Sequence, residues 1–143
     1  MREILFRGII KNDNSRYKRG QWAIGDLVRL QGGNDGKPHI YGCGEVFAET
    51  VGQYTGELDK NGTKIFEGDI VDVKYNIDYV GVAKERIGMF RVVFHNGCFM
   101  KAKIEGCGLY HFISTDEHTV IGNIYDNPEL LKECEGKRKI IYE

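Results

Sequence analysis

The sequence predicts a mainly β protein, built of SH3-like, barrel-type sheets with a short C-terminal helix. Apolar and polar residues alternate along much of the chain, which is the period-two pattern of strands. Glycine is abundant, 19 of 143 residues, whereas proline occurs only twice. Such a composition suits many tight turns, because turns often require the positive φ angles that glycine tolerates. Hydrophobic residues make up 41% and charged residues 29% of the chain, as in an ordinary folded protein.

The alternation is clearest in residues 69–75, a predicted strand. Val71, Val73 and Tyr75 fall on one face of this strand, and Asp72 and Lys74 fall on the other. Further strands are expected at residues 4–10, 22–30, 51–55, 64–66, 89–94, 99–104 and 119–125.

A tight hairpin is expected at His95-Asn96-Gly97-Cys98, because an Asn-Gly pair between apolar runs favours a two-residue type I′ turn. This turn places Phe94 opposite Phe99 and Val93 opposite Met100. Both faces of the hairpin are then apolar, so it is either covered inside the fold, the preferred interpretation, or covered by a second subunit. The residues that would form such an interface are Val92, Phe94, Phe99 and Met100.

One short helix is expected near the C-terminus. Asn127 suits the N-cap, Pro128 the first helical position and Gly136 the end. A helix of this length is unstable alone in water, so it must dock on the fold. The apolar residues available for docking are Leu130, Leu131 and Cys134, and a basic tail follows at 136–143.

The chain also shows signs of an internal repeat. Gly25–Leu30 matches Gly68–Val73 in residue type and pattern, and Gly42-Cys43-Gly44 recurs as Gly106-Cys107-Gly108. We therefore predict two duplicated halves, 1–56 and 57–135, with a β arm inserted in the second half near 76–100. Chance reuse of turn and strand segments is the alternative.

Charge and cysteine content restrict the function classes. The net charge is −1, which gives no overall excess of Lys and Arg for a phosphate backbone. The four cysteines form no C-x-x-C pair, so reduced thiols are expected and no metal or other cofactor is predicted. No stretch approaches the roughly 18 apolar residues of a membrane span, and the apolar run at the start is too short for a signal peptide. We expect a protein of the bacterial cytoplasm.

Several segments together resemble the YopX family of phage and prophage proteins of Gram-positive bacteria. The most specific are Val51–Gly56, Asp59–Gly62 and Ile65–Val71. The opening Arg2–Gly8, the segment Gly20–Val28 and the stretch Val120–Leu131 are also similar to the family, whereas residues 76–118 match weakly. The resemblance implies a single domain over 1–143, a barrel-like β fold and a phage context. It brings no established reaction or binding residues.

The segment from Gln53 to Asp69 is the candidate binding surface, because polar side chains are concentrated in it. Its members are Gln53, Tyr54, Thr55, Asp59, Asn61, Glu67 and Asp69. Asp59 and Asn61 are also typical turn residues that bond their own backbone. A structural role is therefore the preferred interpretation.

The sequence gives no basis for assigning catalytic, cofactor-binding or metal-binding residues. Neither H-E-x-x-H, G-x-S-x-G nor a Walker loop is present. His118, with Asp116 and Glu117, would form a metal or acid–base cluster only if it folded against Glu67 or Asp69, and a solvated turn is favoured over that cluster.

The leading functional hypothesis is a phage accessory protein that binds an unidentified host or phage protein, with self-association as a further expectation. The alternative is a nucleic-acid-binding β-barrel module that uses Tyr17, Lys18, Arg19 and Trp22. A metal-dependent hydrolase whose site forms only in the fold is a further alternative.

Overall fold

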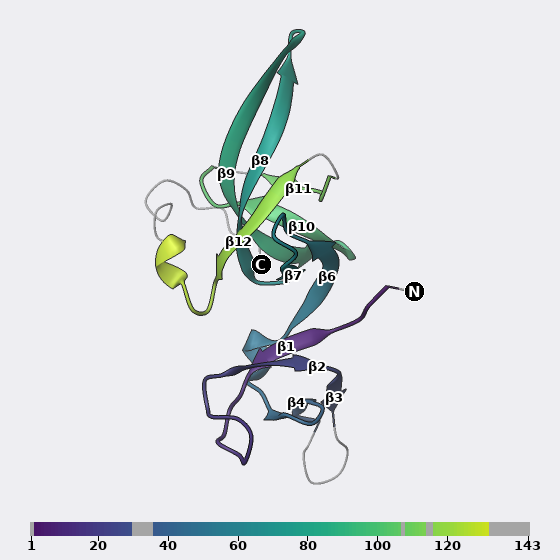
Figure 1. The fold of residues 1–143 in the computed structure, drawn as a ribbon, viewed down its shortest axis with the longest axis vertical. Helices are drawn as coiled ribbons and strands as arrows, with labels where there is room; N and C mark the ends of the chain where they lie inside the picture. Colours follow the sequence, from purple (N-terminus) through teal and green to yellow (C-terminus); the bar gives the residue numbers. More distant parts are fainter. Residues whose placement is uncertain (1, 30–35, 107, 114–115, 132–143) are drawn as a thin grey trace. The chain divides into compact units, whose positions relative to one another are not determined.

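A computed structural model describes residues 2–29, 36–106, 108–113 and 116–131. The chain divides into two compact units, unit 1 from Met1 to Gly56 and unit 2 from Glu57 to Glu143. Both units are built of antiparallel strands, so the prediction of a mainly β protein is confirmed (Figure 1). The SH3-like topology and the origin of the units by duplication stay predictions.

Unit 1 contains two small antiparallel sheets. Strand β1 (Phe6–Ile9) lies between β2 (Trp22–Gly25) and the start of β6 (Gly52–Leu58). Strands β3 (Leu27–Arg29), β4 (Pro38–Ile40) and β5 (Gly44–Glu45) form the second sheet, and a 3-10 turn, η1 (Ala48–Thr50), leads into β6.

The core of unit 1 is formed by Ile10, Ala23, Ile40 and Val46, all of which are almost fully buried. Gly8 on β1 approaches this core closely, because a Cβ atom built on it would lie 2.9 Å from the side chain of Val46. The absence of a side chain at Gly8 therefore lets β1 pack directly against Val46.

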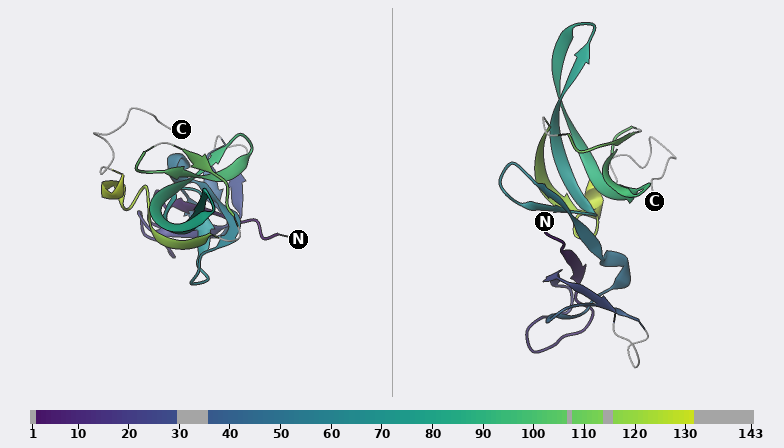
Figure 2. Two further views of the ribbon diagram at one scale, coloured as in Figure 1. Left: turned by 90° about the horizontal axis from the view of Figure 1, so that it is seen from above. Right: turned by 90° about the vertical axis from the view of Figure 1, so that its right-hand side faces the viewer.

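Unit 2 is organised around a five-stranded antiparallel sheet in the order β11-β10-β9-β8-β12. The sheet curls into a half-barrel, which is visible in the view from above (Figure 2). Its strands are β8 (Asp69–Tyr79), β9 (Val82–His95), β10 (Cys98–Lys103), β11 (Leu109–Tyr110) and β12 (Glu117–Asn123), and β7 (Lys64–Phe66) pairs with β6.

Apolar side chains cover both faces of this sheet. On the inner face, Ile65, Val71, Val73, Phe90 and Val92 form a buried cluster. On the other face, Ile70 and Ile104 are covered by partly buried hydrophobic residues, which are Met89, Ile124, Leu130 and Leu131. The two-sided apolar pattern of the sequence is therefore largely accounted for inside unit 2.

The hairpin between β9 and β10 has the predicted register. Phe94 lies opposite Phe99, and Val93 lies opposite Met100. Asn96 and Gly97 have φ angles of 50° and 80°, as a type I′ turn requires. The prediction of this hairpin is confirmed.

The short C-terminal helix is not shown. The described part of that segment contains only one 3-10 turn, η2 (Pro128–Leu130), and Asn127 makes no side-chain cap. Instead, its Oδ1 accepts a hydrogen bond from the backbone N–H of Asn123, and its Nδ2 donates to Glu129. Leu130 and Leu131 do dock on the fold as expected, whereas Cys134, Gly136 and the tail 136–143 lie outside the described residues.

Strands β8 and β9 extend beyond the rest of their sheet as a long two-stranded hairpin (Figure 1). Their pairing continues from Ile70 opposite Arg91 to Tyr79 opposite Val82. Val80 and Gly81 form the tip, with φ angles of 52° and 76°. We call residues 75–88 the arm.

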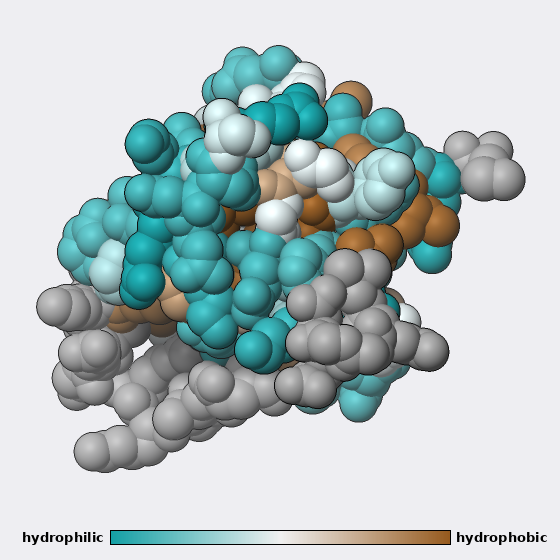
Figure 3. Space-filling model, turned by 90° about the horizontal axis from the view of Figure 1, so that it is seen from below, coloured by the Kyte–Doolittle hydropathy of each residue, from teal (hydrophilic) through white to brown (hydrophobic). Residues whose placement is uncertain are grey.

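The described surface is mostly hydrophilic on the face in Figure 3, where hydrophobic residues occupy only small areas. Among the described residues, no helix has the length and apolar character needed to cross a membrane.

Candidate functional site

The most unusual group in unit 2 is a buried lysine. Lys101 lies on β10 directly opposite Val92 of β9, and only 1% of it is exposed. Its position follows from strand alternation, since Val92 and its cross-strand partner both face the interior of the half-barrel. Burying an ammonium group without partners costs a large amount of free energy, so Lys101 must be stabilised by the groups around it.

The Lys101 ammonium group is surrounded by hydrogen-bond acceptors and aromatic rings. Nζ donates to Oδ2 of Asp116 at 2.8 Å and to Nε2 of His118 at 3.0 Å. It also lies over the rings of Phe90 and Phe112, 5.7 and 5.4 Å from their centroids. Ion pairing, a hydrogen bond and two cation–π contacts together offset the loss of hydration.

His118 on β12 is buried, and its ring packs 5.2 Å from that of Phe112. Burial lowers the pKa of His118, the nearby Lys101 charge lowers it further, and Asp116 and Asp59 partly oppose this change. An ammonium group has only donors, so Nε2 of His118 accepts and the neutral ring carries its proton on Nδ1.

This cluster joins strands that are not neighbours in the sheet. Lys101 belongs to β10 and His118 to β12, and β9 and β8 lie between them in the strand order. The hydrogen bond therefore links two strands across the interior of the half-barrel.

Asp59 fixes the turn between β6 and β7. Its Oδ1 accepts hydrogen bonds from the backbone N–H groups of Asn61 and Thr63, and its Oδ2 accepts one from Val120 on β12. Burial alone would raise the pKa of Asp59, but the three backbone donors and the charge of Lys60 outweigh it and lower the pKa. These hydrogen bonds hold the β6–β7 turn and connect it to β12.

Asp69 has a similar local role at the start of β8. It is 2% exposed, and its Oδ2 accepts a hydrogen bond of 2.7 Å from the backbone N–H of Phe66. This bond stabilises the turn through Glu67 and Gly68, where Gly68 has a φ angle of 93°.

The remaining residues of the predicted binding surface lie at several places. Gln53, Tyr54 and Thr55 are on the part of β6 that belongs to unit 1, where Gln53 lies opposite Phe6 and Tyr54 is buried. Asn61 is exposed in the β6–β7 turn of unit 2. A common binding surface for these residues stays a prediction.

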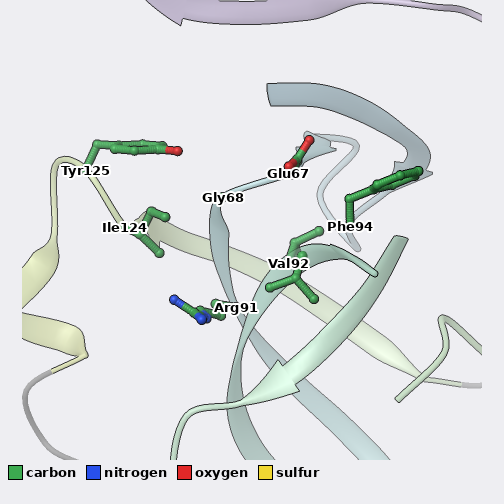
Figure 4. Close-up of a pocket in the computed structure, with 8 residues that line it drawn as sticks. Glu67, Gly68, Arg91, Val92, Phe94, Ile124 and Tyr125 are labelled. Carbon is green, nitrogen blue, oxygen red and sulfur yellow. The ribbon is translucent and has the colours of Figure 1, made fainter. Parts of the chain in front are cut away.

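A small pocket of about 180 Å³ adjoins the Glu67-Gly68 turn (Figure 4). Gly68 joins its two sides, because its N–H donates to the carbonyl of Val92 and its own carbonyl accepts from Ile124. The residues that line the pocket are Glu67, Gly68, Arg91, Val92, Val93, Phe94, Ile124 and Tyr125. The pocket is smaller than typical small-molecule sites, which have about 300–1,000 Å³.

The residues of the predicted interface hairpin differ in exposure. Val92 and Met100 are buried within unit 2, whereas Phe94 is 53% exposed and its ring packs 5.1 Å from that of Phe99. Phe94 and Phe99 are thus the part of this hairpin that a partner can reach.

From the sequence, a cluster of His118, Asp116 and Glu117 was considered only if it folded against Glu67 or Asp69, and a solvated turn was preferred. The structure instead brings His118 and Asp116 to Lys101, and Glu117 forms an exposed ion pair with Lys60 at 3.5 Å. Lys101 itself was missed, although the hairpin register already placed it on the inner face opposite Val92. Within the described residues, no group of three or more His, Cys, Asp or Glu side chains is placed to hold a metal ion.

The aromatic and basic residues of the nucleic-acid alternative lie in unit 1. The Arg7 guanidinium covers the ring of Trp22 at 4.6 Å, and Tyr17 packs against the unit 1 core. Arg19 lies 5.2 Å from the ring of Phe47, and Lys18 is exposed. The face of Trp22 toward Arg7 is therefore already occupied, which leaves less room for stacking a base.

Comparison with solved structures finds the crystal structure of protein EF1440 from Enterococcus faecalis. It is 27% identical to this chain, and the match covers 92% of this chain and 99% of that one, with a TM-score of 0.49. No curated protein matches the chain. The profile of the YopX family, described as YopX protein, matches residues 8–132, which is most of the sequence. The chain belongs to the YopX family, as its sequence motifs indicated.

Proposed function

We propose that this protein is a phage or prophage accessory protein that acts in the host cytoplasm by binding a protein partner through its arm. The observation that supports this proposal is the open backbone of the arm. The partner would supply an extended segment that adds a strand to the arm, a common mode of protein recognition.

The outer edges of the arm have no strand partner among the described residues. Strand β12 pairs with β8 from Asp69 to Lys74, and β10 pairs with β9 from Phe90 to His95. Residues 75–79 therefore pair only with residues 82–86, and Ile87 and Gly88 pair only with Lys74 and Val73 of β8. A row of unpaired N–H and C=O groups is a template for another strand.

Apolar side chains on the arm also support partner binding. Val80 at the tip is 85% exposed, and Ile87 on β9 is 72% exposed. An isolated two-stranded hairpin is only marginally stable in water, so a third strand would stabilise the arm.

The charges of β9 favour a different protein over a second copy as the added strand. In a symmetric antiparallel pair, the residue on the two-fold axis lies opposite its own copy. A pair centred on Lys84, Glu85 or Arg86 would place like charges opposite one another, which is destabilising. A partner segment with a complementary sequence avoids this repulsion.

The test is a variant in which Asn76–Glu85 is replaced by Asn-Gly, which joins Tyr75 to Arg86 by a two-residue turn. Tyr75 and Arg86 are already opposite each other, so the rest of the sheet keeps its register. Proteins retained from extracts of infected or lysogenic cells would be identified, and the affinity of each purified candidate would be measured by calorimetry.

We expect the shortened arm to weaken binding of the true partner at least tenfold. Ile24→Lys in unit 1 is the control, because Ile24 is also a large exposed hydrophobic residue, and it should bind normally. Equal affinity of the wild-type and shortened proteins would contradict the proposal. Arm-dependent dimers in light scattering would instead identify a second copy as the partner.

A further inference from the structure

We propose that the Lys101–His118 hydrogen bond is a proton-controlled closure of the half-barrel, made in neutral solution and broken when His118 is protonated. The two residues come from β10 and β12, which face each other across the interior of unit 2.

The closure depends on a lone pair. His118 accepts the Lys101 proton through Nε2 at 3.0 Å, and protonation of this nitrogen replaces the acceptor by a second donor. Two cations would then lie about one hydrogen-bond length apart in a buried place. Repulsion of that kind is much stronger in the interior than in water.

The charges around His118 do not compensate for this repulsion. Asp116 is already bound to Lys101 at 2.8 Å, and Asp59 is bound to three backbone N–H groups. Lys60 and Glu117 form their ion pair on the exposed side of β12. The aromatic neighbours, Phe90 and Phe112, carry no charge. The carboxylates of Asp116 and Asp59 offset the repulsion only in part, since burial and Lys101 outweigh them in lowering the His118 pKa.

The direction of the His118 titration agrees with this geometry. Its pKa is lowered in the folded protein, first by burial and then by Lys101. A base whose pKa is lowered by folding binds more protons in the open state, so the closed state is favoured above pH ~6.5 and loses stability below it. Asp59 titrates below its ordinary pKa of 3.8, outside this window.

Opening of this contact would separate β12 from β10 and let water reach the rings of Phe90 and Phe112. Every residue involved lies in the half-barrel, so the opening does not depend on a partner of the arm. The buried Lys101–His118 pair thereby controls the stability of the sheet.

Hydrogen exchange of the whole protein between pH 7.5 and 5.5 tests the proposal. Exchange protection, corrected for the intrinsic rate at each pH, is expected to fall by up to about tenfold in peptides from β10 and β12, because an open-state histidine has a pKa of about 6.5. Peptides from β1 and β2 in unit 1 should change less than twofold.

His118→Gln keeps an acceptor for Lys101 but does not titrate, so its protection should not depend on pH in this range. His111→Gln is the matched control, because His111 is exposed, and it should behave like the wild type. If His118→Gln does not fold, an NMR titration of the wild-type protein tests the proposal instead. The imidazole resonance of His118 is then expected to titrate below pH 6.5, together with amide signals of β10. The proposal is overturned if exchange protection of the wild-type β10 and β12 does not change with pH, or if it still falls with pH in His118→Gln. A pKa of His118 at or above the ordinary histidine value would also overturn it.

Discussion

The carboxylate of Asp59 accepts a hydrogen bond of 3.0 Å from the backbone N–H of Val120, a residue 61 positions further along the chain. The same carboxylate accepts bonds from Asn61 and Thr63 within its own turn. A residue that looks like a local turn former therefore also anchors β12.

Asp59→Ala should destabilise unit 2 strongly. The substitution leaves three backbone donors in part-buried positions without their acceptor. A fully buried donor that loses its partner costs about 1–3 kcal/mol, and water can replace part of this loss at Asn61 and Thr63. We expect a loss of about 3 kcal/mol in the free energy of unfolding, measured by urea denaturation. Asn61→Ala, an exposed change in the same turn, should stay within about 0.5 kcal/mol. A loss of equal size in both variants would contradict this role of Asp59.

Acid should remove the contribution of Asp59. Its pKa is lowered from 3.8 in the folded protein, so its stabilising effect is complete above that value and is lost as the pH falls below it. Unfolding midpoints of the wild type and Asp59→Asn, measured from pH 6 to 2, should converge at the acid end. A difference that stays constant over this range would show that the titration of Asp59 is not linked to folding.

Lys101→Met should destabilise unit 2 by about 3–5 kcal/mol, because it leaves the Asp116 carboxylate partly buried without its cation. Adding Asp116→Leu removes that charge as well. The double variant should therefore be more stable than Lys101→Met alone, and urea denaturation measures the difference. No recovery in the double variant would mean that packing of the lysine side chain, and not the ion pair, carries the effect.

Gly8→Ala should destabilise unit 1 by about 1–3 kcal/mol, since its Cβ would lie 2.9 Å from Val46 and overpack the core. Val46→Ala makes room for the new methyl group. Gly8→Ala should then cost less in the Val46→Ala background than in the wild type, which a cycle of four proteins followed by thermal unfolding would show. Equal costs in both backgrounds would exclude this contact as the cause.

Gly97→Ala should cost about 1–2 kcal/mol, because Gly97 has a φ angle of 80° in the β9–β10 turn. Asn96→Gly is the matched change at the neighbouring position, where the φ angle is 50°, and it should be nearly neutral. Urea denaturation of both variants tests the turn type. An equally tolerated alanine at Gly97 would be inconsistent with a type I′ turn.

The sequence predicted best where local chemistry determines the structure. The Asn96-Gly97 pair was sufficient to give the register of β9 and β10, because a two-residue turn leaves only one pairing. Leu130 and Leu131 were recognised as docking residues from their apolar character alone. The predicted N-cap at Asn127 was wrong. The side chain of Asn127 forms hydrogen bonds with Asn123 and Glu129 and does not cap a helix.

The buried cluster could be predicted only in part. Alternation in the hairpin places Lys101 on the inner face, but nothing local indicates that β12 will lie across the half-barrel from β10. Asp116 and Glu117 were therefore interpreted as a solvated turn. Glu117 is indeed exposed, but it is the first residue of β12, and Asp116 is bound to Lys101. The curvature of the sheet, a property of five strands together, brings Asp116 and His118 to Lys101.

The second apolar face of the half-barrel has a consequence for synthesis of the protein. Ile124, Leu130 and Leu131, which cover Ile70 and Ile104, follow every strand of that sheet in the chain. A nascent chain whose strands have left the ribosome still lacks this cover. Until the last of these residues emerges, the nascent chain exposes an apolar surface around Ile70 and Ile104 to which chaperones can bind.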